Sequence, residues 1–223
     1  MLFAGHMILA YFINQALRRK FQLYFSLPLL FTASILPDLD LLFSPIIPHH
    51  TLTHSLTFWS LICISLTIIK KRFALPYVIA ILSHFLIGDV ITGNPTLFYG
   101  LSNQTFGNIR SDFSSRYGAD YAMLYQTLVE AAMVCMFVVY AMVKRNLPSI
   151  FSFPIKHVLI FGIVLLLIII GSLKSHMLYV LANQTEIMYF SYTIIVLSQV
   201  IFSALITKGT IRITIRQATN TDS

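Results

Sequence analysis

Charged side chains are scarce in this sequence of 223 residues: Asp, Glu, Lys and Arg make up 10% of it, whereas hydrophobic residues make up 57%. A soluble domain typically has about 25% charged residues. The chain therefore has too few polar side chains to cover a water-exposed surface, which excludes an ordinary soluble protein and predicts an integral membrane protein. Its length suits one domain with about five to seven membrane-spanning helices.

Cysteine is equally scarce. The two cysteines, Cys63 and Cys135, lie in apolar segments and form no CxxC motif. This excludes a disulfide framework and a thiolate metal site, and it predicts a buried packing role for both. The first apolar stretch lacks a preceding basic segment and a small-residue cleavage site, so we expect it to be a retained helix and not a signal peptide.

Long apolar runs are what the sequence has in abundance. Seven can be marked, at residues 2–17, 21–36, 53–69, 73–92, 119–143, 157–173 and 188–207. A hydrocarbon core about 30 Å thick needs about 20 helical residues. The first two runs are short, and Pro28 interrupts the second, so they are expected to form a tilted pair or a hairpin that does not fully cross. The prediction is an all-α, polytopic membrane domain, divided into residues 1–207 (motif-bearing half 1–105, additional spans 119–207) and a basic tail at 208–223.

The basic residues gather in alternate connections between these runs. Twelve of the 15 Lys and Arg residues do so, and the exceptions are Arg110, Arg116 and Lys174. By the positive-inside rule, the connections rich in basic residues and the C-terminal tail are cytoplasmic, in a plasma (inner) membrane. The net charge of +7 is thus explained by topology, and no nucleic-acid partner is expected.

Histidine and aspartate concentrate at the predicted outer, extracytoplasmic face. Lone charges in apolar surroundings cost several kcal/mol, so such groups need partners. Imidazole nitrogen and carboxylate oxygen suit zinc, manganese or iron. We therefore predict one or two divalent ions, zinc first, with ligands drawn from His6, Asp38, Asp40, His49, His50, His54, His84 and Asp89.

Several of these residues have simpler interpretations. Asp38 follows Pro37 and could be a turn or cap residue. His50 and His54 have the i, i+4 spacing of a two-histidine metal site on a helix, but one member of the adjacent histidine pair would then be outside the site. His6 could be an ordinary helix-end histidine. Glu130, deep in an apolar run, is either a hydrogen-bonded, protonated glutamate or a proton relay.

The order of the polar motifs resembles a known family. The resemblance rests on His6, LPDLD at 36–40, HHTLTHS at 49–55, and SHFLIGDVITG at 83–93 followed by LFYGLS. This is similar to the membrane-bound, metal-dependent hydrolases that include the LexA-regulated YdjM-like inner-membrane proteins, over about the first 105 residues. The resemblance implies a helical membrane protein, a hydrolytic activity, and metal binding by His6, Asp38, Asp40, His49, His54, His84 and Asp89.

Two positions depart from the family pattern. His50 stands where the family has Arg, and four residues separate His84 from Asp89 where the family usually has three. Five positions turn about 140° on an ideal helix, so the two side chains would not share a face. A one-residue π-bulge near Gly88 would bring them back together, and such bulges favour functional sites.

The function predicted from these patterns is hydrolysis of a phosphoester or lipid by a metal-activated water. Asp40 or Asp89 would accept the proton. Arg110 and Arg116 would bind an anionic group of the substrate, or else be ordinary loop charges. One alternative is a metal- or proton-linked transporter, which predicts ionisable groups at several depths. Another is a non-catalytic scaffold stapled by a metal that has no open coordination position.

Overall fold

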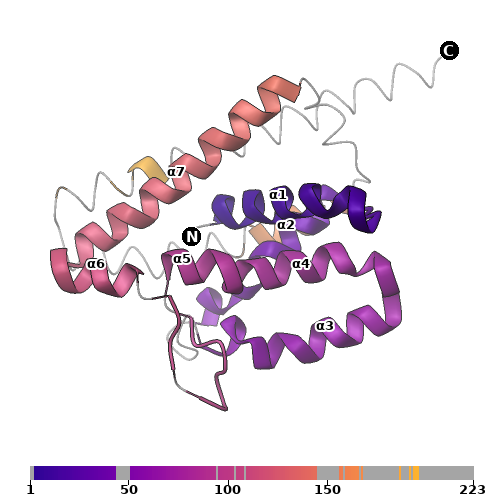
Figure 1. Cartoon of the computed structure of the whole chain (residues 1–223), viewed down its shortest axis with the longest axis horizontal. Helices are drawn as coiled ribbons and strands as arrows, with labels where there is room; N and C mark the ends of the chain where they lie inside the picture. The colour runs from indigo at the N-terminus through magenta and orange to yellow at the C-terminus, as the bar shows by residue number, and fades with distance from the viewer. Residues whose placement is uncertain are drawn as a thin grey trace.

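The computed structural model is helical (Figure 1). It describes residues 3–43, 51–93, 95–102, 104–107, 109–144, 156–157, 159–165, 167, 186, 191 and 193–195. Within these residues there are helices and turns and no strand, so the predicted all-α class is confirmed. The predicted tail at 208–223, most of the run at 188–207 and about half of the run at 157–173 lie outside the described residues.

The first two apolar runs form α1 (Phe3–Phe21) and α2 (Leu27–Ile35), and α2 continues into the 3₁₀ helix η1 (Leu36–Phe43). Pro28 does not interrupt this run as predicted, because it lies in the first turn of α2. The first turn tolerates proline, since its N–H groups have no intrahelical partner in any case.

The next two runs form an antiparallel pair. Helix α3 (Leu56–Lys70) begins after Ser55, whose hydroxyl accepts the backbone N–H of Thr57 at 3.1 Å. Helix α4 (Leu75–Ser83) continues through the π-helical segment η4 (His84–Asp89) into α5 (Val90–Thr92). The connection between the apolar runs at 73–92 and 119–143 ends in a helix, α6 (Ile109–Tyr117). This helix is polar and lacks the apolar periodicity that would have revealed it in the sequence.

Helix α7 (Ala119–Lys144) is the longest helix, and it packs on α1. Gly118, with φ of 96°, separates it from α6, and this left-handed conformation favours glycine. Figure 1 shows α4 between α3 on one side and α1 with α2 on the other. The core lies between α1, α2, α4 and α7, where the rings of Tyr11 and Phe137 meet edge to face at 5.6 Å.

Two helical stretches are long and apolar enough to cross a membrane, by length and composition: Leu75–Thr92 and Tyr121–Tyr140. Apolar side chains also face outward, among them Leu61 and Ile68 of α3, which are 71% and 72% exposed. Cys63 is buried as predicted, whereas Cys135 is exposed on α7. Association with a membrane is thus indicated, and the number of spans stays a prediction.

Candidate metal centre

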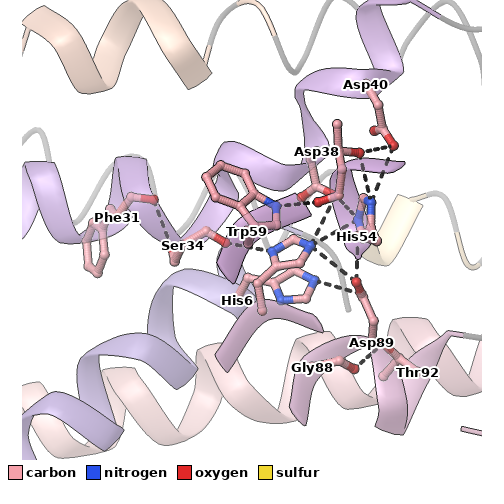
Figure 2. A network of polar contacts seen from close by, with 12 residues as sticks. His6, Phe31, Ser34, Asp38, Asp40, His54, Trp59, Gly88, Asp89 and Thr92 are labelled. Carbon is pink, nitrogen blue, oxygen red and sulfur yellow. Dashed lines mark hydrogen bonds and ion pairs between the residues drawn. The ribbon is translucent and has the colours of Figure 1, made fainter. Parts of the chain in front are cut away.

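Six of the predicted site residues lie together in the interior, although they come from separate parts of the chain (Figure 2). Each has an exposed fraction between 0% and 5%. They are His6 in α1, Asp38 and Asp40 in η1, His54 in the short 3₁₀ helix η2 (Leu52–His54), and His84 and Asp89 at the two ends of η4.

Two imidazoles and two carboxylates meet at the centre of this group. Nε2 of His54 lies 3.2 Å from Nε2 of His84. Oδ1 of Asp38 lies 3.4 Å from the former nitrogen and 3.5 Å from the latter. Oδ2 of Asp89 lies 3.4 Å and 3.3 Å from the same two atoms. These four residues, the central cluster, present atoms of the types that bind divalent metals. The ligand atoms of His54, His84 and Asp89 lie close enough together to hold an ion, and Asp38 belongs to a second such group.

The orientation of both cluster imidazoles is fixed from their other nitrogen. Nδ1 of His84 donates to the carbonyl oxygen of Ser34 at 2.6 Å, because a carbonyl can only accept. Ser34 lies in the last turn of α2, just before the 3₁₀ helix η1. Nδ1 of His54 faces Oδ2 of Asp40 at 3.3 Å. Both rings therefore turn Nε2 toward the centre, the arrangement that neighbouring groups impose on metal-binding histidines.

The π-helical segment brings His84 and Asp89 to one face. Five positions on an ideal α-helix would separate them, and the wider π turn between His84 and Asp89 restores their convergence. The π-bulge near Gly88 on which the convergence of the two side chains depends is therefore present. Glycine is required there, because a Cβ atom at position 88 would lie 2.4 Å from Cε1 of His6.

His6 contacts two members of the central cluster from the side of α1. Its ring stacks on that of His84, with centroids 3.6 Å apart and planes 14° from parallel. Its Nε2 lies 3.4 Å from Oδ1 of Asp89, the oxygen that does not face the cluster nitrogens. Its ligand atoms also come close enough to those of Asp38 and His84 to share an ion. His6 thus lies beside the other predicted metal ligands in the fold.

Asp40 lies on the far side of His54 from the centre. Figure 2 shows Asp38 and Asp89 at one edge of the His54 ring and Asp40 at the other. The sequence predicts Asp40 as a ligand and as a proton acceptor, whereas the structure places its carboxylate where it orients an imidazole. Adjacency in sequence did not reveal this, because residues 38 and 40 point in different directions on a 3₁₀ helix.

Asp38 is held in its ionised form. Burial raises the pKa of this carboxyl, but the imidazoles of His84, His54 and His6 lower it by more. The net result is a pKa of about 2, below the ordinary value of 3.8. Among the described residues, no donor lies within hydrogen-bonding distance of Oδ2 of Asp38. Its Oδ1 faces the cluster, and its second oxygen is thus left for another partner.

The other predicted residues are placed differently. His49 and His50 lie outside the described residues. Thr51, with φ of −106° and ψ of −107°, is not helical, and His54 lies in η2, before α3 begins at Leu56. Arg110 and Arg116 both belong to α6, and the side chain of Arg116 is exposed.

Three further residues support the site. The hydroxyl of Thr53 donates to Oδ2 of Asp40 at 2.6 Å, and the indole N–H of Trp59 donates to the carbonyl oxygen of Thr53 at 2.6 Å. Ser34 contributes a main-chain carbonyl. Trp59 and Ser34 were not predictable from the sequence, since a backbone acceptor and a packed indole leave no motif. For Thr53, the only sign in the sequence of a role in the site is its position within the HHTLTHS motif.

Comparisons with family models, curated proteins and solved structures find no match to this chain. The function is therefore argued from the site.

Proposed function

We propose that this chain is a membrane-embedded, metal-dependent hydrolase. The observation that carries the proposal is the convergence of two imidazole nitrogens and two carboxylate oxygens, 3.2–3.5 Å apart across the five pairs described above. Four buried ionisable side chains rarely meet without a partner, because each charge costs several kcal/mol to desolvate. One divalent cation, two carboxylates and two neutral imidazoles would together carry no net charge.

The spacing favours zinc. Four ligands at about 2.0–2.2 Å from a tetrahedral ion lie about 3.3–3.6 Å from one another, from simple geometry. An octahedral ion with similar bonds would hold adjacent ligands at about 2.8–3.1 Å and opposite ones above about 4 Å. The five distances given above lie in the tetrahedral range. The ligand atoms fall into two groups of three that share His84: His54, His84 and Asp89, and His6, Asp38 and His84. Manganese and iron, which favour higher coordination numbers, are the weaker proposals.

When bound, such an ion would supply a water acidified toward neutral pH. The residues of the chain would then orient and deprotonate that water. We assign proton acceptance to Oδ2 of Asp38, because this oxygen lies beside the centre, has no donor among the described residues, and belongs to the most exposed member of the cluster at 5%. Asp40 and Asp89 are less suited, since their carboxylates face His54 and His6 respectively.

The proposed substrate class is a phosphoester, specifically a lipid phosphodiester. The support is the candidate spans Leu75–Thr92 and Tyr121–Tyr140 and the outward apolar side chains of α3. Arg110 and Arg116 on α6 would bind the anionic group. In this proposal the site faces the outer side of an inner membrane with the C-terminus in the cytoplasm, as the distribution of Lys and Arg favours. Kinship with the YdjM-like hydrolases belongs to the same proposal.

A second function is favoured by one observation. The two groups of candidate ligands together offer five side chains, more than the three that a catalytic zinc ion uses. Sites closed by protein ligands are structural, whereas catalytic zinc keeps one position open. The ion would then staple η1, η2 and η4 together without turnover. The two functions differ in whether one ligand can give way to water.

The experiment begins with elemental analysis of the purified protein in detergent. We expect about one zinc per chain, lost in His54→Ala and Asp38→Ala. The control is His157→Ala, which removes a histidine that contacts Ser26 at 2.9 Å, away from the cluster. Hydrolysis of a chromogenic phosphodiester and of phospholipid vesicles is then measured with chelator and after zinc addition. Metal absent from the wild type would refute the site; metal present without chelator-sensitive hydrolysis would favour the structural function.

A further inference from the structure

A buried acid from the C-terminal half of the chain contacts α1 beside His6, outside the motifs of the metal cluster. Glu130 is the one charged residue in the candidate span Tyr121–Tyr140, and its side chain has an exposed fraction of 0%. Its Oε1 accepts the backbone N–H of Gly5 at 2.9 Å, across 125 positions of sequence. The alternative of a hydrogen-bonded glutamate therefore has a definite partner.

That partner lies at a helix end. Gly5 is the third residue of α1 (Phe3–Phe21), where N–H groups have no acceptor within the helix. A carboxyl oxygen there satisfies one of these donors and also interacts favourably with the helix dipole. Glu130 thus acts as an N-terminal cap supplied by another helix, and it fixes the first turn of α1 against α7.

The next residue after Gly5 is His6. Its ring is confined on the opposite side by Gly88, since there is no room for a Cβ atom between the two. From this position the ring stacks on His84 and contacts Oδ1 of Asp89 at 3.4 Å. A shift of the first turn of α1 would move His6 relative to both.

We propose that Glu130 is a positioning residue of the metal centre, which acts by capping the first turn of α1 so that His6 orients His84 and Asp89. The inference rests on the proposed metal site. It gives the C-terminal half of the chain a role in a centre whose motifs all lie in the first half. If Glu130 only packed α7 on α1, its replacement would have no effect on metal binding that depends on the presence of His6.

The test is a double-mutant cycle on zinc affinity, measured by chelator competition on the full chain in detergent. Loss of an outer orienting group typically weakens metal binding 10- to 100-fold, roughly the effect we expect for Glu130→Ala. His6→Ala should weaken it similarly, and the double variant should be no weaker than His6→Ala alone. Glu130→Gln should restore near-wild-type affinity, because its amide oxygen can accept the same N–H. Thr127→Val is the matched control, since the Thr127 hydroxyl donates within α7, to the carbonyl oxygen of Met123 at 2.9 Å.

Each outcome decides the inference. Unchanged affinity in Glu130→Ala overturns it, as does an equal weakening by Glu130→Ala in the wild-type and His6→Ala backgrounds. Wild-type protein that binds no zinc overturns the metal site itself, and this result is distinct because it precedes every variant. Should Glu130→Ala fail to fold by circular dichroism, Gly5→Pro removes the same donor in a helical turn that tolerates proline, and the same cycle is run with it.

Discussion

Gly88 offers the sharpest test of the packing around the centre, because two effects of known sign oppose each other there. Replacing a helical glycine by alanine ordinarily stabilises a helix by about 0.5–1 kcal/mol, through lower entropy of the unfolded chain. At position 88 the new Cβ would lie 2.4 Å from Cε1 and 2.5 Å from Nδ1 of His6. The neighbouring ring must therefore move, or the π turn must deform.

The clash decides the sign. Ordinary carbon contacts begin at about 3.5 Å, so His6 must shift by about 1 Å. It cannot do so freely, since its opposite face is stacked on His84 at 3.6 Å. Overpacking of a filled core typically costs about 1–3 kcal/mol. Gly88→Ala is therefore expected to lower the free energy of unfolding by roughly 1–2 kcal/mol after the helix gain is subtracted.

The assay compares Gly88→Ala with Gly162→Ala by thermal unfolding in detergent, with zinc affinity measured in parallel. Gly162 is also helical, and within the described part of the chain its added Cβ would meet nothing within 4 Å. Gly162→Ala should show the helix gain alone and leave zinc binding unchanged, whereas Gly88→Ala should lose both stability and zinc affinity. Equal stabilisation by the two substitutions would refute the placement of His6 against Gly88.

Three other expectations concern the metal centre. Asp40→Asn should keep one zinc per chain but weaken the affinity for zinc roughly 10- to 100-fold, because Asp40 orients His54 without reaching the centre. Asp38→Asn should lose the metal. Elemental analysis after dialysis separates the two variants, and equal loss of zinc in both would contradict the geometry. Chelation lowers the unfolding temperature, since an ion present at about 100 times its dissociation constant stabilises the folded state by about 2.7 kcal/mol; zinc addition should restore it, and no change would argue against a bound ion. Trp59→Phe removes the indole donor to Thr53 and costs roughly 1 kcal/mol of unfolding free energy, with zinc stoichiometry retained; a loss of metal in this variant would show that the indole does more than hold Thr53 in place.

The spacing of residues within one element predicted how their side chains are placed, whereas contacts between elements could not be predicted from the sequence. The five-position interval from His84 to Asp89 required a π-bulge to bring the two side chains together, and the fold contains one. The i, i+4 spacing of His50 and His54 assumes a helix, whereas the chain is not helical at Thr51; His50 itself lies outside the described residues.

Contacts that depend on backbone groups left no mark in the sequence. The carbonyl of Ser34 holds His84, and the N–H of Gly5 binds Glu130, yet any residue type supplies both groups. Helix α6 escaped notice because its polar sequence has no apolar stripe. Asp40 illustrates the remaining difficulty, since two acids two residues apart look equivalent until a 3₁₀ helix directs them to opposite edges of one imidazole.

The balance between hydrolysis and a purely structural ion depends on which ligand can yield to water, and the four are not alike. His84 is held at Nδ1 by Ser34, His54 is held at Nδ1 by Asp40, and Asp89 contacts His6 through its second oxygen. Asp38 has no such second contact among the described residues, and it is the most exposed of the cluster. A carboxylate can also pivot between its two oxygens without leaving the site. Asp38 is therefore the ligand at which an open position would form, and a hydrolase built on this fold would need it to move while the other three stay fixed.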